Sequence, residues 1–203
     1  SVKIDESHPK IPINPYGVTK LRFEEILREQ SSKHNINAAV LRYFNAAGAD
    51  ESGLIGEYHQ PESHLIPRIF NNLLNKEDVL KIYGNDHITK DGTCIRDYIH
   101  VTDLVHAHFL TFNKMLHEKG FLDFNLGNGN GFSVLEIIKA CESISKKKVN
   151  YQFVGKRIGE PEYLVADSSK AISELKWDIV FSDIYEIIET AWRWHNRLYN
   201  EII

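Results

Sequence analysis

The chain alternates between helical and extended patterns of hydrophobic positions. Apolar residues at helical spacing predict a helix over 16–34, and the short continuous apolar run at 38–44 predicts a buried strand. The Gly- and Pro-containing stretch at 45–63 predicts a long loop, of the kind that is often functional. A helix over 64–75 and a strand over 79–84 follow.

The second half of the chain continues the alternation. The segment over 85–101 is turn-rich and leads to an extended piece. A helix follows that Thr102 or Asp103 caps and that ends near His117. Ser133 and Glu136 form a capping box at the start of a later helix. The other expected elements are extended segments at 121–126, 149–154 and 163–167 and helices at 168–177 and 182–199. This order of elements predicts an α/β fold.

Composition narrows the class of protein. The 203 residues are 42% hydrophobic and 26% charged, which is ordinary for a globular domain, and the net charge of −4 argues against a nucleic-acid-binding protein. No apolar run has the length of a membrane span, and the first twenty residues do not have the pattern of a signal peptide. Cys94 and Cys141 are far apart, so we expect neither a disulfide framework nor a zinc site of the CxxC type, and we expect a reducing cytoplasm.

A glycine-rich segment, LGNGNGF at 126–132, follows a strand and precedes a helix, as a dinucleotide-binding turn does. The third glycine of that motif is missing at its usual spacing, and KKKVN at 146–150 stands where an acidic residue for the ribose is expected. We therefore interpret 126–132 as a tight turn between a strand and a helix.

Tyr16 and Lys20 are four residues apart, so they share one face of the first helix. A lysine ammonium beside a phenol favours the phenolate. A tyrosine with a pKa near 10 needs a shift of about three units, or about 4 kcal/mol, to act as a base near pH 7. Such a pair can transfer a proton to and from a substrate hydroxyl while a hydride leaves the same carbon. The same spacing also occurs by chance in many proteins, as a surface tyrosine near a lysine.

Further polar side chains follow strands or begin helices, where α/β folds bind ligands. These are Asn45, Arg96, His100 and Arg157. Two separate arginines suit a diphosphate, because each can bind it with two parallel hydrogen bonds. The histidines at 100, 106 and 108 do not have the spacing of a metal site, and we expect no bound metal.

Five segments together carry a resemblance to a known family. PYGVTK, LRYFNAAGA, HLIP, GNDHITKDGTCIRDYIHVTDL and NLGNGNGFSVLE resemble the UDP-glucose 4-epimerases, which belong to the extended short-chain dehydrogenase/reductase family. The resemblance runs essentially from end to end of the chain. It implies the C-terminal part of an NAD(P)-binding Rossmann-like fold with a smaller α/β domain that binds a UDP-sugar.

The resemblance implies NAD as the cofactor and a role for each matching residue. Tyr16 exchanges the 4-hydroxyl proton, and Lys20 holds the nicotinamide ribose and lowers the tyrosine pKa. Tyr43 and Phe44 lie beside the nicotinamide. The residues implied to bind the UDP-sugar are Asn45, His64, Leu65, Leu80, Lys81, Ile82, Tyr83, Arg96, Arg157, Glu160 and Leu164.

Within that set, Tyr83 stacks on the uracil, which Leu80, Lys81 and Ile82 flank. Arg96 and Arg157 clamp the diphosphate. Glu160 reaches the uridine ribose. Leu164 occupies the position of a family residue whose size controls which sugars enter the pocket. A leucine there is intermediate in size, so the resemblance leaves open whether N-acetylated UDP-sugars are substrates. Many family members have asparagine at the position of His64.

The implied activity is epimerisation at C4 of UDP-glucose and UDP-galactose through a transient 4-ketose. Residues 1–45 are expected to belong to the dinucleotide-binding domain, and 46–203 mainly to the UDP-sugar domain, with about 90–118 returning to the first. The family also implies a homodimer, an N-terminal glycine-rich turn and a catalytic serine that precede Tyr16. Residues 1–203 alone are therefore expected to be inactive.

Two alternatives stay open. A sugar-nucleotide dehydratase or decarboxylase shares the Tyr16–Lys20 pair and the DYIHV segment at 97–101. A binding protein that keeps the fold without turnover is the second, and the presence of both Tyr16 and Lys20 argues against it.

Overall fold

The computed structural model describes residues 3–75 and 79–201. Along the chain, the elements are α1 (Pro15–His34), β1 (Ala38–Tyr43), β2 (Asn45–Ala47), α2 (Leu65–Asn75), β3 (Leu80–Tyr83), β4 (Ile95–His100), α3 (Val101–His117), β5 (Phe121–Leu126), β6 (Gly131–Ser133), α4 (Val134–Ser145), β7 (Tyr151–Val154), β8 (Tyr163–Leu164), α5 (Ser169–Leu175) and α6 (Ile184–Glu201). This order confirms the α/β class.

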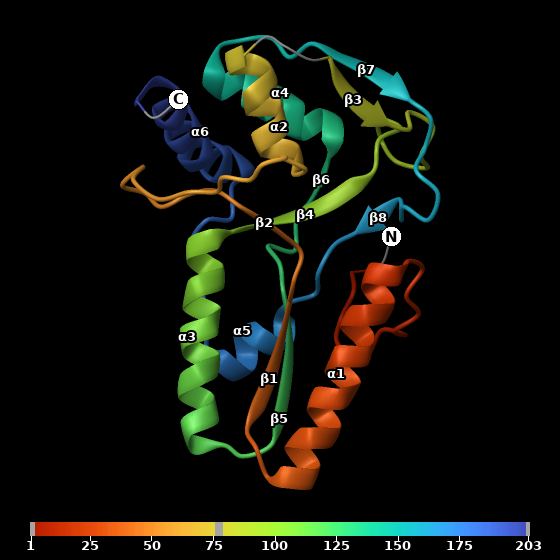
Figure 1. The fold of residues 1–203 in the computed structure, drawn as a ribbon, viewed down its shortest axis with the longest axis vertical. Coiled ribbons are helices and arrows are strands. Elements are labelled where there is room, and N and C mark those ends of the chain that lie inside the picture. The colour runs from red at the N-terminus through yellow and green to blue at the C-terminus, as the bar shows by residue number, and fades with distance from the viewer. Residues whose placement is uncertain (1–2, 76–78, 202–203) are drawn as a thin grey trace.

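Two groups of elements lie one above the other (Figure 1). In the lower group, β1 and β5 form a parallel pair, with α1 along one side and α3 along the other. In the upper group, α2, α4 and α6 pack together beside the parallel pair β3–β7. Between them runs β4, which pairs with β2, β6 and β8. No described helix is both long enough and apolar enough to cross a membrane.

Each group has its own buried core. The upper core gathers apolar side chains of α2, α4 and α6, with Phe70 and Ile187 fully buried. The lower core joins β5, α3 and α5 around Phe124 and Trp177, and the indole of Trp177 donates to the carbonyl oxygen of Asp103 at 3.0 Å. Elements of the two cores are interleaved along the chain, so neither core is one continuous segment.

Local sequence explains where α1 begins and how it is held. The Asn14 side chain accepts the Gly17 amide at 2.8 Å, and Pro15 occupies the first turn, where its missing N–H costs little. Arg42 of β1 donates to Glu24 of α1 at 2.7 and 2.8 Å and to Asp123 of β5 at 2.9 Å. These charged contacts fix α1 against the β1–β5 pair.

Two expectations about element boundaries were wrong. The expected loop at 45–63 begins with the short strand β2, which pairs with β4 in the register Asn45 to Tyr98. The cap of α3 is His100, not Thr102 or Asp103, because its ring Nδ1 accepts the Thr102 amide at 3.1 Å. A histidine nitrogen can replace the usual oxygen cap, which sequence rules for caps do not include.

The glycine-rich segment makes the expected turn after β5, but it leads into the short strand β6 and not directly into a helix. Amides of Asn128 and Gly129 donate to the Asp97 carboxylate at 2.9 and 3.0 Å, so they are already bonded within the protein. A Cβ at Gly127 would lie 2.4 Å from an Asp97 oxygen. Burial raises the pKa of Asp97, although these amides and that of Ala166 oppose the rise.

Candidate active site

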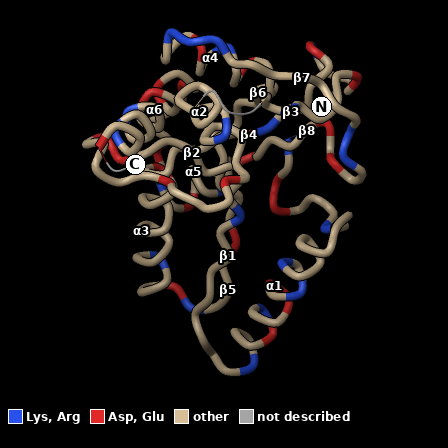
Figure 2. The backbone as a smooth tube through the Cα atoms, turned by 45° about the horizontal axis from the view of Figure 1, so that its top comes forward, with Lys and Arg blue, Asp and Glu red and all other residues tan. Residues whose placement is uncertain are grey.

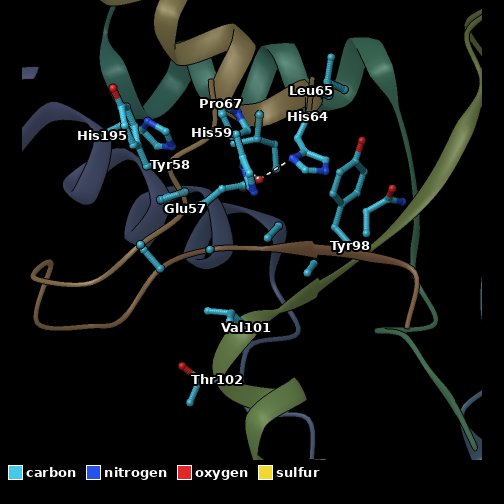
Figure 3. A pocket seen from close by; sticks show the side chains of 18 of the residues that line it. Glu57, Tyr58, His59, His64, Leu65, Pro67, Tyr98, Val101, Thr102 and His195 are labelled. Carbon is cyan, nitrogen blue, oxygen red and sulfur yellow. Dashed lines mark ion pairs between the residues drawn. The ribbon is translucent and has the colours of Figure 1, made fainter. Parts of the chain in front are cut away.

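A pocket of about 930 Å³ opens where α1, β2, α2 and α3 meet. Its volume is in the range of sites that enclose a small organic ligand. Figure 3 shows that side chains of the β2–α2 loop, of the first turn of α2 and of the first turn of α3 surround it. The sequence-derived site residues that line this pocket are Tyr16, Tyr43, Phe44, Asn45, His64 and Leu65.

Tyr16 enters the pocket from the first turn of α1 and is 71% exposed. The Lys20 ammonium lies 5.3 Å from the centre of the Tyr16 ring, so the helix places the pair side by side as its spacing predicts. Lys20 has no ion-pair partner within the described part of the chain. The Tyr16 hydroxyl and the Lys20 ammonium are therefore available to contact a ligand.

The floor of the pocket comes from β2 and β4. Asn45 is held by its side-chain amide, which donates to the Asp97 carbonyl oxygen at 2.7 Å. Phe44 joins β1 to β2, and its amide donates to Leu126 at the end of β5. These backbone contacts fix the segment that carries Tyr43, Phe44 and Asn45.

One wall is the β2–α2 loop. Four of its side chains, Glu57, His59, Glu62 and His64, approach one another closely, and we call them the acid–histidine cluster. The Glu57 carbonyl oxygen accepts the Trp194 indole N–H at 2.8 Å.

The remaining wall is formed by His195 and by two helix starts. The first turns of α2 and α3 face the pocket. His195 of α6 is 7% exposed, and its burial lowers its pKa to about 4, with Glu62 opposing the shift. A neutral imidazole therefore stands at the back of the pocket at neutral pH.

A second group of predicted residues lies at the other end of β4, and we call Tyr83, Arg96, Arg157 and Glu160 the arginine cluster. Arg96 donates to Glu160 at 3.0 Å, and the Arg157 guanidinium lies 3.8 Å from the centre of the Tyr83 ring. Arg157 lowers the pKa of Tyr83 through a hydrogen bond and its charge. The second Glu160 carboxylate oxygen is buried without a hydrogen-bond partner among the described residues.

The two groups are connected through β4. Arg96 and Tyr98 are two positions apart on one strand, so they share a face and lie about 7 Å apart. Tyr98 lines the pocket, and Arg96 belongs to the arginine cluster. The strand β4 therefore carries one residue of each group on the same face.

Four other predicted residues occupy different surroundings. Leu80 and Ile82 are 3% and 2% exposed in the upper core, so their main chain is the part that can meet a ligand. Lys81, between them on β3, is exposed. Leu164 of β8 is half-buried and pairs with Arg96 across the β4–β8 ladder.

Two side chains that drew attention in the sequence are structural. His100 is fully buried, stacks on Phe181 with ring centres 3.9 Å apart, and places Nε2 3.0 Å from the Thr190 hydroxyl. Both of its ring nitrogens are therefore engaged within the protein. Burial raises the pKa of the Cys94 thiol, so Cys94 is not activated as a nucleophile.

Sequence analysis missed several residues of the pocket. Glu57, Tyr58, His59 and Tyr98 line it, as does His195 from the far end of the chain. The spacing E-x-H-x-x-E-x-H within 57–64 was a signal for the acid–histidine cluster. No sequence signal connects His195 with residues more than 120 positions earlier.

The fold and the site define an α/β protein with the NAD-binding Rossmann-like fold of the UDP-glucose 4-epimerases. Residues 2–127 match the model of the NAD dependent epimerase/dehydratase family, and the chain belongs to that family.

Individual relatives agree with this assignment. UDP-glucose 4-epimerase of Halalkalibacterium halodurans is 43% identical over 196 residues, which cover 97% of this chain and 59% of that protein. The crystal structure of UDP-glucose 4-epimerase from Brucella ovis in complex with NAD has a TM-score of 0.90 and 43% identity, over 95% of this chain and 59% of that one. The Bifidobacterium longum enzyme in complex with NAD⁺ and UDP has a TM-score of 0.91 and 36% identity, over 97% and 59%. The chain thus spans about 59% of the length of these relatives.

Proposed function

We propose that this chain belongs to an enzyme that interconverts UDP-glucose and UDP-galactose by NAD-dependent epimerisation at C4. The observation that carries the proposal is the pairing of two sites along β4. The arginine cluster suits a nucleoside diphosphate, and the pocket with Tyr16 suits a neutral sugar. Relatives named as UDP-glucose 4-epimerases support this substrate class.

In this proposal the arginine cluster holds UDP. Arg96 and Arg157 bind the diphosphate, since guanidinium groups match phosphate oxygens in geometry and charge. Tyr83 stacks on the uracil, which the main chain of Leu80, Lys81 and Ile82 flanks. The unpaired Glu160 oxygen accepts a ribose hydroxyl, which would relieve the cost of leaving it buried without a partner.

The pocket receives the hexose. Asn45 contacts the sugar near the diphosphate, and His64 and Leu65 contact the ligand from the first turn of α2. Leu164 limits the size of the substituent that fits at C2 of the sugar. The exposed Tyr16–Lys20 pair and the neighbouring Tyr43 and Phe44 suit a nicotinamide nucleoside, with the Lys20 ammonium donating to the ribose hydroxyls.

Tyr16 performs the proton transfer. As the C4–H bond breaks, the Tyr16 side chain takes the proton of the 4-hydroxyl, and a 4-ketose forms. NAD, when bound, would supply a hydride acceptor for the oxidation and a hydride donor for the reduction at C4. The ketose turns in the pocket, presents its other face, and regains the proton from Tyr16. No net oxidation occurs, and the configuration at C4 is inverted.

The remaining parts of the proposal concern the whole protein. Residues 1–45, with about 90–118, serve the dinucleotide-binding domain, and 46–203 mainly the UDP-sugar domain. The enzyme works in the cytoplasm as a homodimer. The fragment of residues 1–203 alone neither holds NAD tightly nor catalyses the reaction.

Proton NMR of the full-length gene product with NAD⁺ and UDP-galactose tests the proposal. We expect the anomeric signal of UDP-galactose to decline while that of UDP-glucose appears, until both reach a constant ratio. A protein that binds NAD and UDP-galactose without any change in these signals would contradict the proposal.

A further inference from the structure

The acid–histidine cluster has the composition of a metal site. Glu57, His59, Glu62 and His64 lie within eight residues of the β2–α2 loop and the start of α2. One ligand atom from each can be chosen so that all four lie within 4.8 Å of one another. Among the described residues, this is the group of at least three His, Cys, Asp or Glu side chains whose ligand atoms lie that close together.

The distances between the imidazole nitrogens and the carboxylates scatter around the ligand separation in a tetrahedral site. The His64 Nδ1 atom is 2.5 Å from Glu57 and 3.3 Å from Glu62, and the His59 Nδ1 atom is 3.1 and 3.6 Å from the same two carboxylates. Four ligands at about 2.0–2.1 Å from a tetrahedral Zn²⁺ lie about 3.3 Å from one another. Small side-chain movements therefore suffice to place all four atoms around one ion.

Charge and donor type also favour a divalent cation. Two carboxylates carry two negative charges, and neutral imidazole is a preferred ligand of zinc and of its neighbours in the first transition row. A hard cation such as Mg²⁺ would be served less well, since it prefers oxygen ligands and keeps several waters. The donor set points to zinc or a similar ion.

The surroundings hold the ligands in place. The Glu62 carboxylate accepts the amides of Ser63 and His64, both at 2.7 Å, which fixes its direction. The Glu57 main chain is held by Trp194 of α6. A Cβ at Gly56 would lie 2.3 Å from the Trp194 ring, so the loop sits directly against α6. Supporting contacts of this kind are a regular part of metal sites.

We propose that Glu57, His59, Glu62 and His64 form a four-coordinate site for a divalent transition-metal ion that fastens the β2–α2 loop to the start of α2. With all four positions filled by protein, the ion serves as a structural clamp and takes no part in the proposed epimerisation. Binding through Nδ1 leaves Nε2 of His59 and of His64 for other contacts. Figure 3 shows both rings beside the pocket.

Zinc titration of the full-length gene product tests the site. After removal of metal with a chelator, calorimetric titration with ZnCl₂ is expected to show one tightly bound ion per chain. In the double variant His59→Ala/His64→Ala, the affinity of that site falls by about 100-fold or more. The matched control His106→Ala/His117→Ala removes two exposed histidines of α3 and leaves the zinc affinity unchanged.

A second variant covers the case in which the first does not fold. Glu57→Gln/Glu62→Gln keeps the size of both side chains and removes the charge. With Co²⁺ as the probe, the unaltered protein is expected to show the visible absorption of a tetrahedral site, and this variant to lose it. Equal Zn²⁺ binding by the unaltered protein and either cluster variant would overturn the proposal, as would no stoichiometric binding at all.

Discussion

The arginine cluster and the pocket differ in how firmly they can hold a ligand. Arg96 is 13% exposed and ion-paired at 3.0 Å to Glu160. Tyr16, at the edge of the pocket, is 71% exposed, and the pocket around it encloses about 930 Å³. One end of β4 therefore offers fixed charges, and the other offers open space.

The difference explains how one site can invert a stereocentre. A ketose must present both of its faces to the same hydride donor, so the sugar needs freedom to turn. In the proposed function, a diphosphate held by Arg96 and Arg157 would keep the reacting carbon near Tyr16 during that rotation. Binding energy from a part of the substrate that does not react thus supports the chemistry at another part.

Removal of the Tyr16 hydroxyl tests the pocket end and has the largest expected effect. Tyr16→Phe removes the group that we propose accepts the proton, and kcat for UDP-galactose is expected to fall by about 10³-fold, in the usual range for general acid–base catalysis. The Kd for UDP stays within about twofold, because the arginine cluster is untouched. Tyr185→Phe, on an exposed tyrosine of α6, is the matched control and keeps full activity. Equal activity of the two variants would remove Tyr16 from the mechanism.

Acidic pH is expected to lower the stability of the folded protein through His195, which lies at the back of the pocket. Its pKa is about 4 in the folded protein and 6.5 as the reference value. Between these values the unfolded chain binds a proton that the folded protein does not, so stability falls as the pH falls from 6.5 to 4. The expected loss is about 3 kcal/mol, and His100, whose pKa burial also lowers, adds to it in the same direction.

Urea unfolding at several pH values measures this effect. His195→Asn is expected to flatten the dependence of the unfolding free energy on pH between 6.5 and 4. The control His106→Asn, on an exposed residue, leaves the slope as it is. An unchanged slope in His195→Asn would show that His195 is not buried in its neutral form.

Disruption of the ion pair tests the arginine cluster. Arg96→Gln removes the proposed charged contact with the diphosphate and leaves Glu160 without its Arg96 partner, so the Kd for UDP is expected to rise by about 10–100-fold. Fluorescence or calorimetric titration with UDP gives the Kd. The control Arg193→Gln, half-exposed on α6, leaves UDP binding unchanged. A normal Kd for UDP in Arg96→Gln would contradict the assignment of the diphosphate to this cluster.

Leu164 is expected to give the smallest effect. In Leu164→Tyr, a larger side chain on β8 narrows the space beside the sugar, so turnover of UDP-N-acetylglucosamine is expected to fall about tenfold relative to UDP-glucose. The ratio of the two substrates in one preparation corrects for changes in folding. An unchanged ratio would show that Leu164 does not border the sugar.

The sequence predicted most elements because their signals are local. The Ser133–Glu136 capping box and the strand at 121–126 were confirmed to the residue. The proximity of Tyr16 and Lys20 follows from helix geometry alone. The pairing of Asn45 with Tyr98 could not be predicted, since it joins residues 53 positions apart through a strand of three residues.

The composition of the site was only partly predictable. Arg96 and Glu160 were selected through the family resemblance, and the structure brings them into contact. The spacing of Glu57, His59, Glu62 and His64 was present in the sequence. Its meaning depends on a loop conformation that Trp194 supports from α6. Long-range contacts of this kind carry no periodic signal.

The relative affinity of UDP and UDP-galactose tests the division between firm and loose binding most directly. It is measured by calorimetry on the NAD-loaded full-length gene product carrying Tyr16→Phe, in which turnover does not obscure binding. Firm binding of UDP with loose binding of the sugar predicts that the two Kd values lie within about tenfold of each other, a difference of about 1.4 kcal/mol. A UDP-galactose affinity about 100-fold or more above that of UDP would contradict it, because the pocket would then hold the sugar too firmly for it to turn.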